Sequence, residues 1–440
     1  MYPNLYYWFK DWFGVELAPL QFLNTFGLMV AVGFAAAAWI LTLELKRKER
    51  LGLLSFQEET IMVGMPASLS ELVTNGLLGF LFGFKIIGLF LSKPVDVSAQ
   101  DFIFSTQGNV LGGVVLGGLM VYLKWKEKDK QKLASPEKRN IRIWPHDRVG
   151  DIIVLGLIFG ILGAKLFDNF EHWDEFIADP IGRLFSQSGL TFYGGLILAS
   201  IAIIWFAYRK GIVIAHLVDA AAPALMLAYA IGRLGCQISG DGDWGIYNSA
   251  YVSNDAGVVH LASPGAFEAS LKKNETYFLK GMVVENNQML FVTDRTYSSL
   301  DKVPQRSVKA PSWLPVWMFA YSYPQNVNKD GIRMPLITDE HNRVLPSPVF
   351  PTPFYETLFC TALFFVLWFL RKRIRRPWLI FGIYLFLNGL ERFMVEFLRV
   401  NIAYDVSEGL QFSQAQLIAI GLMVIGTLLS LSSKYISPKK

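Results

Sequence analysis

The residues best suited to chemistry lie in a glycine-rich segment, YAIGRLGCQISGDGDWG, at positions 229–245. Arg233 falls at the end of a long apolar run, where an ionisable side chain is expensive to bury and is a functional candidate. Glycine lets the backbone approach a ligand closely, and the glycines around this arginine are Gly232, Gly235, Gly240, Gly242 and Gly245. A permanently charged guanidinium beside backbone N–H groups is suited to holding phosphate. The segment therefore predicts a phosphate site around Arg233, and Asp241 and Asp243 follow this arginine within the same segment.

A second group of charges lies near the C-terminus, in the run NGLERFMVEFLRVN. Arg392, Glu396 and Arg399 are spaced i, i+4 and i+7, which places them on one face of a helix. Counted from Pro377 at the start of the preceding apolar run, this face lies in the outer third of the bilayer, at the predicted depth of Arg233. Three arginines at one depth predict binding of a phospholipid headgroup or of a leaving phosphate.

Two shorter segments reach the same depth. They contain Tyr193, Gly194 and Gly195 in GLTFYGGLI, and Tyr355 and Glu356 in PFYET. The five histidines show no metal-ligand spacing, and the two cysteines, Cys236 and Cys360, lie in or beside apolar runs. We therefore expect neither a metal site nor a disulfide scaffold, and no cofactor is predicted.

The elements that position these residues are predicted to be membrane-spanning helices. Apolar residues make up 52% of the chain and charged residues only 18%, against about 25% charged in soluble domains. The apolar residues form blocks close to the roughly 20 residues that a helix needs to cross a bilayer. Nine spans are predicted: 20–43, 72–92, 109–125, 149–168, 190–208, 215–236, 355–370, 377–398 and 414–432. The predicted fold class is an all-α polytopic membrane protein, since packed soluble folds do not place so many apolar blocks in one chain.

Charge fixes the expected orientation. Clusters of Lys and Arg follow the odd-numbered spans, at 46–50, 124–139, 209–210, 371–376 and 434–440, whereas the opposite connections are acidic or mixed. The positive-inside rule then places the N-terminus outside and the C-terminus in the cytoplasm. The net charge of +5 follows from the inner loops and favours contact with anionic lipid over nucleic acid.

Three parts are expected along the chain. A first transmembrane part covers 1–240, and a second covers 353–440. Between them, residues 241–352 are hydrophilic, with strand-like runs and a proline-rich exit, which predicts a small extracytoplasmic head of mixed α/β character.

A two-helix unit is duplicated within the first part, near 68–126 and 148–208. Laying Lys85 on Lys165 aligns the two outgoing helices, and the glycine pair at 112–113 matches the pair at 194–195. We interpret the two copies as lying parallel in the membrane.

Together these segments resemble the prolipoprotein diacylglyceryl transferase family. Gly232, Arg233 and Gly235 match the start of its Gly-Arg-x-Gly-Asn signature. Residues 193–195 correspond to its His-Gly-Gly motif, 351–356 to Pro-x-Gln-Leu-Tyr-Glu, 392–399 to Arg-Phe-x-Val-Glu-Phe-x-Arg, and 26–29 to a Tyr-Gly-Leu motif in the first span. The order and sidedness of these motifs agree along most of the chain.

The departures from the family pattern concern groups that handle protons. Tyr193 stands for the family's His, Cys236 for its signature Asn, Phe26 for its first-span Tyr, and Asn388 for a later Tyr. The acidic signature position corresponds to Asp241 or Asp243, because the turn is one residue longer here.

The resemblance implies transfer of a diacylglyceryl group from phosphatidylglycerol to the lipobox cysteine of prolipoproteins, at the outer-leaflet side of the bacterial inner membrane. Prolipoprotein signal peptides and membrane lipid are the implied partners. Arg233 and Arg392 are expected to hold the phosphate and Arg399 the headgroup, while Tyr193, Asp241 or Asp243 assists the thiol. Substrate-binding positions are expected at Gly194, Gly195, Gly232, Gly235, Cys236, Ser239, Gly245, Tyr355, Glu356, Glu396 and Arg399.

Two alternatives stay open. A paralogue on the same scaffold would transfer a lipid fragment to another acceptor, which the replaced His and Asn favour. The second alternative is a phospholipid-binding or transport protein without catalysis. A transporter should show polar residues through the full depth of the membrane. Here they gather near one face.

Overall fold

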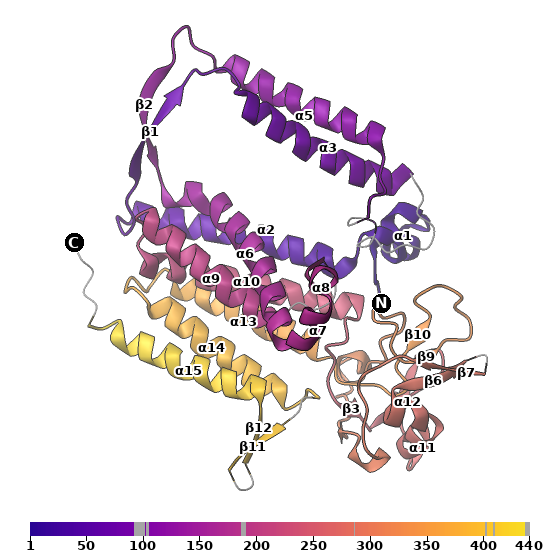
Figure 1. Cartoon of the computed structure of the whole chain (residues 1–440). Coiled ribbons are helices and arrows are strands. Elements are labelled where there is room, and N and C mark those ends of the chain that lie inside the picture. Colours follow the sequence, from indigo (N-terminus) through magenta and orange to yellow (C-terminus); the bar gives the residue numbers. More distant parts are fainter. Residues whose placement is uncertain are drawn as a thin grey trace. The chain divides into compact units, whose positions relative to one another are not determined.

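The computed structural model describes residues 1–91, 102, 105–185, 191–285, 287–400, 403–407 and 410–435, most of them helical (Figure 1). These residues belong to two compact units. The first comprises Met1–Leu17, Leu23–Leu41 and Val218–Lys440, and the second Ala18–Phe22 and Thr42–Leu217. Helix α2 (Thr25–Arg50) and helix α10 (Ile214–Ser239) contribute to both units.

The second unit is built from two helical hairpins. Helix α3 (Leu69–Leu91) packs along α5 (Val110–Lys130), and α6 (Val149–Glu171) packs along α9 (Phe192–Arg209), as Figure 1 shows. An antiparallel ribbon of β1 (Gln57–Val63) and β2 (Glu137–Ile143) flanks the first hairpin. The short elements of this unit are η1 (Ala18–Phe22), η2 (Pro145–Arg148), α7 (Trp173–Ala178) and α8 (Pro180–Phe185).

Within each hairpin, the two helices pack through the same kind of glycine contact. A Cβ built on Gly83 would lie 2.3 Å from the carbonyl oxygen of Gly112, and one built on Gly163 would lie 2.3 Å from that of Gly194. Such close approach of helix backbones requires small residues. The alignment that lays Lys85 on Lys165 places Gly83 on Gly163, and the glycine pair at 112–113 matches the pair at 194–195 after a shift of two residues. We propose that the hairpins are two copies of one unit, and these matched contacts support it.

The packing predicts the effect of one added methyl group. We expect Gly163→Ala to lower the free energy of unfolding by about 1–3 kcal/mol, because its Cβ would meet backbone and the helices must separate. Gly160→Ala on the same helix is the matched control, since no atom lies within 4 Å of its Cβ position. Thermal unfolding of both variants in detergent measures the difference. Equal stability of the two would contradict the packing argument.

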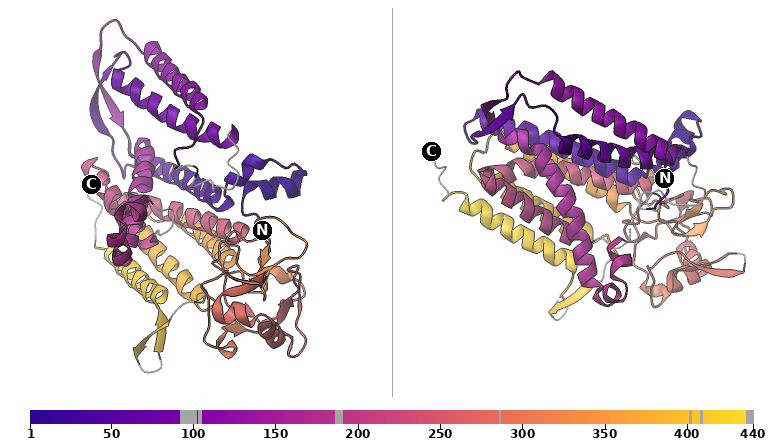
Figure 2. Two further views of the ribbon diagram at one scale, coloured as in Figure 1. Left: turned by 45° about the vertical axis from the view of Figure 1, so that its right-hand side comes forward. Right: turned by 45° about the horizontal axis from the view of Figure 1, so that its top comes forward.

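The first unit contains the remaining long helices. They are α13 (Thr352–Leu370), α14 (Leu379–Glu396) and α15 (Gln414–Ser432), together with most of α10 and the short N-terminal α1 (Leu5–Phe13). Helices α14 and α15 run side by side in both views of Figure 2, and the hairpin of β11 (Ala403–Ser407) and β12 (Leu410–Ser413) joins them. Asp219 of α10 accepts a hydrogen bond from the Phe381 N–H (2.9 Å), which satisfies an otherwise free donor in the first turn of α14.

Residues 240–351, which we call the head, form a mixed segment between α10 and α13. Its elements are β3 (Tyr247–Asn248), β4 (Tyr251–Ser253), β5 (Val259–Leu261), α11 (Ala266–Lys273), α12 (Glu275–Lys280), β6 (Met282–Glu285), β7 (Gln288–Phe291), η3 (Leu300–Lys302), β8 (Gln305–Arg306), η4 (Val316–Met318), β9 (Ile332–Arg333) and β10 (Arg343–Val344). Aromatic side chains, among them Trp244, Tyr247, Phe278 and Tyr323, form its buried core. The structure groups the head with the helices of the first unit, so its independence as a domain stays a prediction.

The helices agree with the predicted class of membrane protein. Six helices within the described ranges are long and apolar enough to cross a bilayer: Thr25–Arg50, Leu69–Leu91, Pro145–Glu171, Ile214–Ser239, Thr352–Leu370 and Gln414–Ser432. Helices α5, α9 and α14 lie at the other three predicted ranges. The chain is a mostly helical polytopic membrane protein, and the count of nine spans remains a prediction.

Candidate active site

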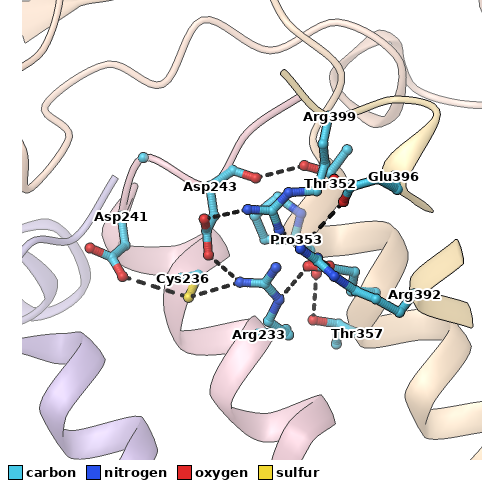
Figure 3. A network of polar contacts seen from close by, with 12 residues as sticks. Arg233, Cys236, Asp241, Asp243, Thr352, Pro353, Thr357, Arg392, Glu396 and Arg399 are labelled. Carbon is cyan, nitrogen blue, oxygen red and sulfur yellow. Dashed lines mark hydrogen bonds and ion pairs between the residues drawn. The ribbon is translucent and has the colours of Figure 1, made fainter. Parts of the chain in front are cut away.

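Arg233 lies near the end of α10, and a tight loop returns the chain over it. Gly240 and Gly242 have φ angles of 69° and 71°, a left-handed conformation that glycine adopts without steric cost. The two turns bring Asp243 back onto the helix end, where its Oδ2 accepts from Nη1 of Arg233 (Figure 3). Thr352, at the start of α13, fixes the loop by donating to the carbonyl oxygen of Asp243 (2.7 Å).

Glu356 joins Arg233 with the two arginines of the C-terminal run, Arg392 and Arg399. It lies one turn into α13 and its side chain is completely buried. Its Oε2 pairs with Nε of Arg233, while Oε1 lies 3.2 Å from Nη1 of Arg392 and 3.4 Å from Nη1 of Arg399. One carboxylate therefore holds the three guanidinium groups together.

Arg399 reaches the site by a different route from the predicted helix face. Helix α14 ends at Glu396, and the N–H of Arg399 bonds to the Glu396 carbonyl (3.1 Å) in the following turn. Nη2 of Arg399 then donates to Oδ1 of Asp243 (2.7 Å). Asp243 is therefore held by two arginines, one on each oxygen.

Arg392 completes the network on the side of α15. Its Nη2 pairs with Oε2 of Glu396 at 3.3 Å, and Oε1 of Glu396 accepts from the Ser413 hydroxyl (2.6 Å). Among the described residues the network thus contains three guanidinium groups and three carboxylates, and its charges balance.

Cys236 and Asp241 lie beside this network. The Cys236 Sγ is 3.8 Å from Nη1 of Arg233 and 3.7 Å from Oδ2 of Asp241. Burial and the neighbouring Asp243 carboxylate raise the pKa of Asp241. Burial also acts to raise the pKa of Asp243, but Arg233 and Arg399 outweigh it and lower that pKa to about 2. Two adjacent carboxyl groups therefore differ in their affinity for a proton.

Three other predicted positions, Tyr355, Gly235 and Gly245, pack against other parts of the chain. The Tyr355 hydroxyl donates to the carbonyl of Met318 in the head (2.6 Å). A Cβ on Gly235 would lie 2.9 Å from the Met29 side chain of α2, whereas no atom lies within 4 Å of the Cβ position of Gly232. Gly245 is required by close approach, because its Cβ would lie 2.4 Å from the carbonyl oxygen of Leu398.

Tyr193, Gly194 and Gly195 belong to α9 of the second unit. Cβ atoms on the two glycines would lie 2.5 Å from the carbonyl oxygen of Gly163 and 2.7 Å from that of Gly160, respectively. Packing against α6 therefore explains the glycine pair. The role of Tyr193 stays a prediction.

The structure adds residues that sequence reasoning missed. Thr352 and Ser413 contact the network, and Glu391 is buried with no hydrogen-bond partner for either carboxylate oxygen among the described residues. Glu391 directly precedes Arg392, and an acidic residue inside an apolar run is itself a candidate functional residue, so the sequence could have indicated it. No signal could pair Ser413 with Glu396, since a β-hairpin separates them. Within the described ranges, no three His, Cys, Asp or Glu side chains are grouped to hold a metal ion.

Comparison with known proteins agrees with the resemblance of the motifs. The family model described as prolipoprotein diacylglyceryl transferase matches residues 109–432. The phosphatidylglycerol–prolipoprotein diacylglyceryl transferase of Leptospira interrogans is 34% identical over 147 residues, which cover 28% of this chain and 43% of that protein. The enzyme of the same name from Streptococcus pyogenes serotype M5 is 31% identical over 128 residues, covering 29% and 44%.

These pairwise matches span less than half the length of each relative. The family model, in contrast, extends over most of this chain and includes Arg233, Asp243, Glu356, Arg392 and Arg399. The resemblance predicted from the motifs is thus confirmed, and the chain belongs to the prolipoprotein diacylglyceryl transferase family.

Proposed function

We propose that the protein transfers a diacylglyceryl group from phosphatidylglycerol to the lipobox cysteine thiol of a prolipoprotein. The observation that supports this most directly is the convergence of Arg233, Arg392 and Arg399 on Glu356. Guanidinium groups in a fixed arrangement bind phosphate oxygens with several charge-assisted hydrogen bonds. They also stabilise charge that develops on a departing phosphate, without reorganising during the reaction.

Phosphate binding requires a carboxylate to move, because the network is already neutral. The side chain of Asp243 is 35% exposed, whereas those of Glu356 and Glu396 are 0% and 2% exposed. Asp243 also sits on a glycine loop and not on a helix. We therefore propose that the lipid phosphate replaces Asp243 on Arg233 and Arg399, while Glu356 keeps the three arginines together.

In the chemical step the cysteine sulfur attacks the glyceryl carbon that bears the phosphate. A C–S bond forms, the C–O bond to the phosphate breaks, and glycerol phosphate leaves with the electron pair on its oxygen. The arginines stabilise that oxygen. The thiol has an ordinary pKa of about 8.5 and must lose its proton for efficient attack.

Asp241 is the better candidate to accept that proton. Neighbouring carboxyl groups whose pKa values are pushed apart commonly divide the roles of base and electrostatic partner. Asp243, with a pKa of about 2, has little affinity for a proton while it is bound to two arginines. Asp241 has a raised pKa and lies beside Cys236, at the edge of the arginine cluster.

Asp241→Asn should lower kcat by about 10²-fold or more, the usual effect of losing a general base. The wild-type enzyme should lose activity as the pH falls through the raised pKa of Asp241, since only the deprotonated form accepts a proton. Asp243→Asn removes a negative neighbour and lowers that pKa, so the acid limb should move to lower pH. The measurement is kcat/KM against pH for the three proteins. An unchanged acid limb in Asp243→Asn would assign the base to another residue.

The sidedness proposed for the reaction follows from where the site lies on the helices. Arg233 and Arg392 are at the C-terminal ends of α10 and α14, and Glu356 is at the N-terminal end of α13. The basic cluster Arg371–Arg376 follows the opposite end of α13. We propose that the site faces the outer leaflet of the inner membrane, with the N-terminus outside, where a lipoprotein signal peptide presents its cysteine.

The experiment that tests the function is an assay with purified protein in detergent. It contains labelled phosphatidylglycerol and a lipobox peptide, with Arg233→Ala as the control. Thioether product that disappears in the control supports the transferase. Release of glycerol phosphate without peptide product would favour a different acceptor, and lipid binding without turnover would favour a non-catalytic protein.

A further inference from the structure

Within the head, Arg295 contacts the site loop, residues 240–245, at both neighbours of Asp243. Arg295 follows β7 of the head, and its Nη2 donates to the carbonyl oxygen of Gly242. Its guanidinium carbon also lies 5.2 Å from the centroid of the Trp244 ring, within the range of a cation–π contact. One side chain thus holds the residues on either side of the carboxylate that pairs with Arg233.

A turn of the head covers the rest of this loop. The Val327 N–H donates to the carbonyl of Ser239 at the end of α10 (3.0 Å), which satisfies a carbonyl that the helix leaves free. A Cβ on Gly240 would lie 2.8 Å from Cβ of Asn326, and one on Gly242 would lie 2.2 Å from Nδ2 of Asn328. Close approach to the backbone of Asn326 thus favours glycine at 240, and the positive φ angles favour it at both 240 and 242.

These contacts are anchored in the core of the head. Trp244 packs on Tyr323, with ring centroids 5.0 Å apart, and the fully buried Tyr323 donates its hydroxyl to Gln237 of α10 (2.8 Å). Arg295 is itself oriented by a bond from its backbone N–H to the Thr293 hydroxyl (3.3 Å). A shift of the head core would thus reach the loop directly.

We infer that Arg295 is a positioning residue that holds the loop 240–245 against the arginine cluster, which keeps the proposed base Asp241 beside Cys236 and pairs Asp243 with Arg233 and Arg399 before lipid binds. A loop with three glycines has many accessible conformations, and contacts from outside select one of them. Misplacement of a catalytic arrangement by about 1 Å can lower the rate by about 10²-fold. The inference deepens the proposed function and rests on it for its effect on turnover, but not for its effect on the loop.

The first test measures the loop itself in the full-length protein. Arg295→Ala should raise the rate of amide hydrogen exchange over residues 238–246 by about tenfold, because local opening becomes easier. Arg343→Ala is the matched control. Arg343 likewise donates to a glycine carbonyl of the head, that of Gly331 (3.0 Å), and pairs with Glu285 (2.8 Å). Neither of these partners belongs to the loop 240–245. Arg343→Ala should leave exchange over 238–246 unchanged.

The second test measures turnover. Arg295→Ala should lower kcat by about 10- to 100-fold, with the KM for the lipobox peptide within about twofold, and Arg295→Lys should recover part of the loss because an ammonium group can still donate to Gly242. Unchanged loop exchange in Arg295→Ala, or equal acceleration in Arg343→Ala, would overturn the inference. If the wild-type protein shows no transfer, the proposed function fails, and the exchange data still decide the role of Arg295.

Discussion

Arg233→Ala is expected to reduce transfer by at least about 10²- to 10³-fold, mainly through kcat. Removal of one preordered donor to a developing oxyanion typically has an effect of this size. Arg233 is also the partner of both Asp243 and the buried Glu356, so its loss leaves two carboxylates with one arginine fewer. Product formation from labelled phosphatidylglycerol measures the change.

Two further variants separate charge from geometry at this position. Arg233→Lys keeps the charge but loses the planar group whose Nη1 and Nε contact different carboxylates, and it should remain more than about tenfold below wild type. Arg306→Ala, an exposed arginine of the head, should retain full activity. Turnover by Arg233→Ala near the wild-type rate would exclude this arginine from the phosphate site.

Glu356→Gln is expected to have the second large effect, on both stability and activity. Breaking a buried ion pair by neutralising one partner costs about 3–5 kcal/mol, and Glu356 is completely buried against three arginines. Thermal unfolding in detergent should show the loss, whereas Glu268→Gln on the exposed face of α11 should leave Tm unchanged.

The same variant has a specific response to lipid. Because phosphatidylglycerol brings a negative charge to the arginines, it should raise the Tm of Glu356→Gln more than that of the wild type. The measurement is Tm as a function of phosphatidylglycerol concentration. A Glu356→Gln protein as stable as the wild type would show that the arginines do not depend on this carboxylate.

Much of the architecture could be predicted from the sequence because local patterns encode it. Long apolar runs specify helices of membrane-spanning length, and the described helices lie at the predicted ranges. Arg233 and Arg392 were predicted at one depth, and the structure brings both to Glu356, although their depth in the bilayer stays a prediction. The paired glycines at 112–113 and 194–195 predicted a duplicated two-helix unit, which stays a prediction; the structure shows that both pairs lie at close helix contacts.

The details of the site depend on packing and turns that no local pattern encodes. Asp241 and Asp243 each follow a glycine, and only the φ angles of Gly240 and Gly242 decide which carboxylate faces Arg233. Arg399 continues the spacing of a helix, yet α14 ends three residues earlier at Glu396. The contact between Arg295 and Gly242 joins segments with no shared periodicity.

The single carboxylate that joins three helical segments also limits how a lipid can reach the arginines. Glu356 ties α13 to the ends of α10 and α14, so these helices cannot part laterally at this level without separating charges inside the membrane. Of the three carboxylates in the network, Asp243 alone has a substantially exposed side chain. We therefore propose that the headgroup arrives from the side of the loop, where Asp243 is exposed, and that these three helices stay together while it binds.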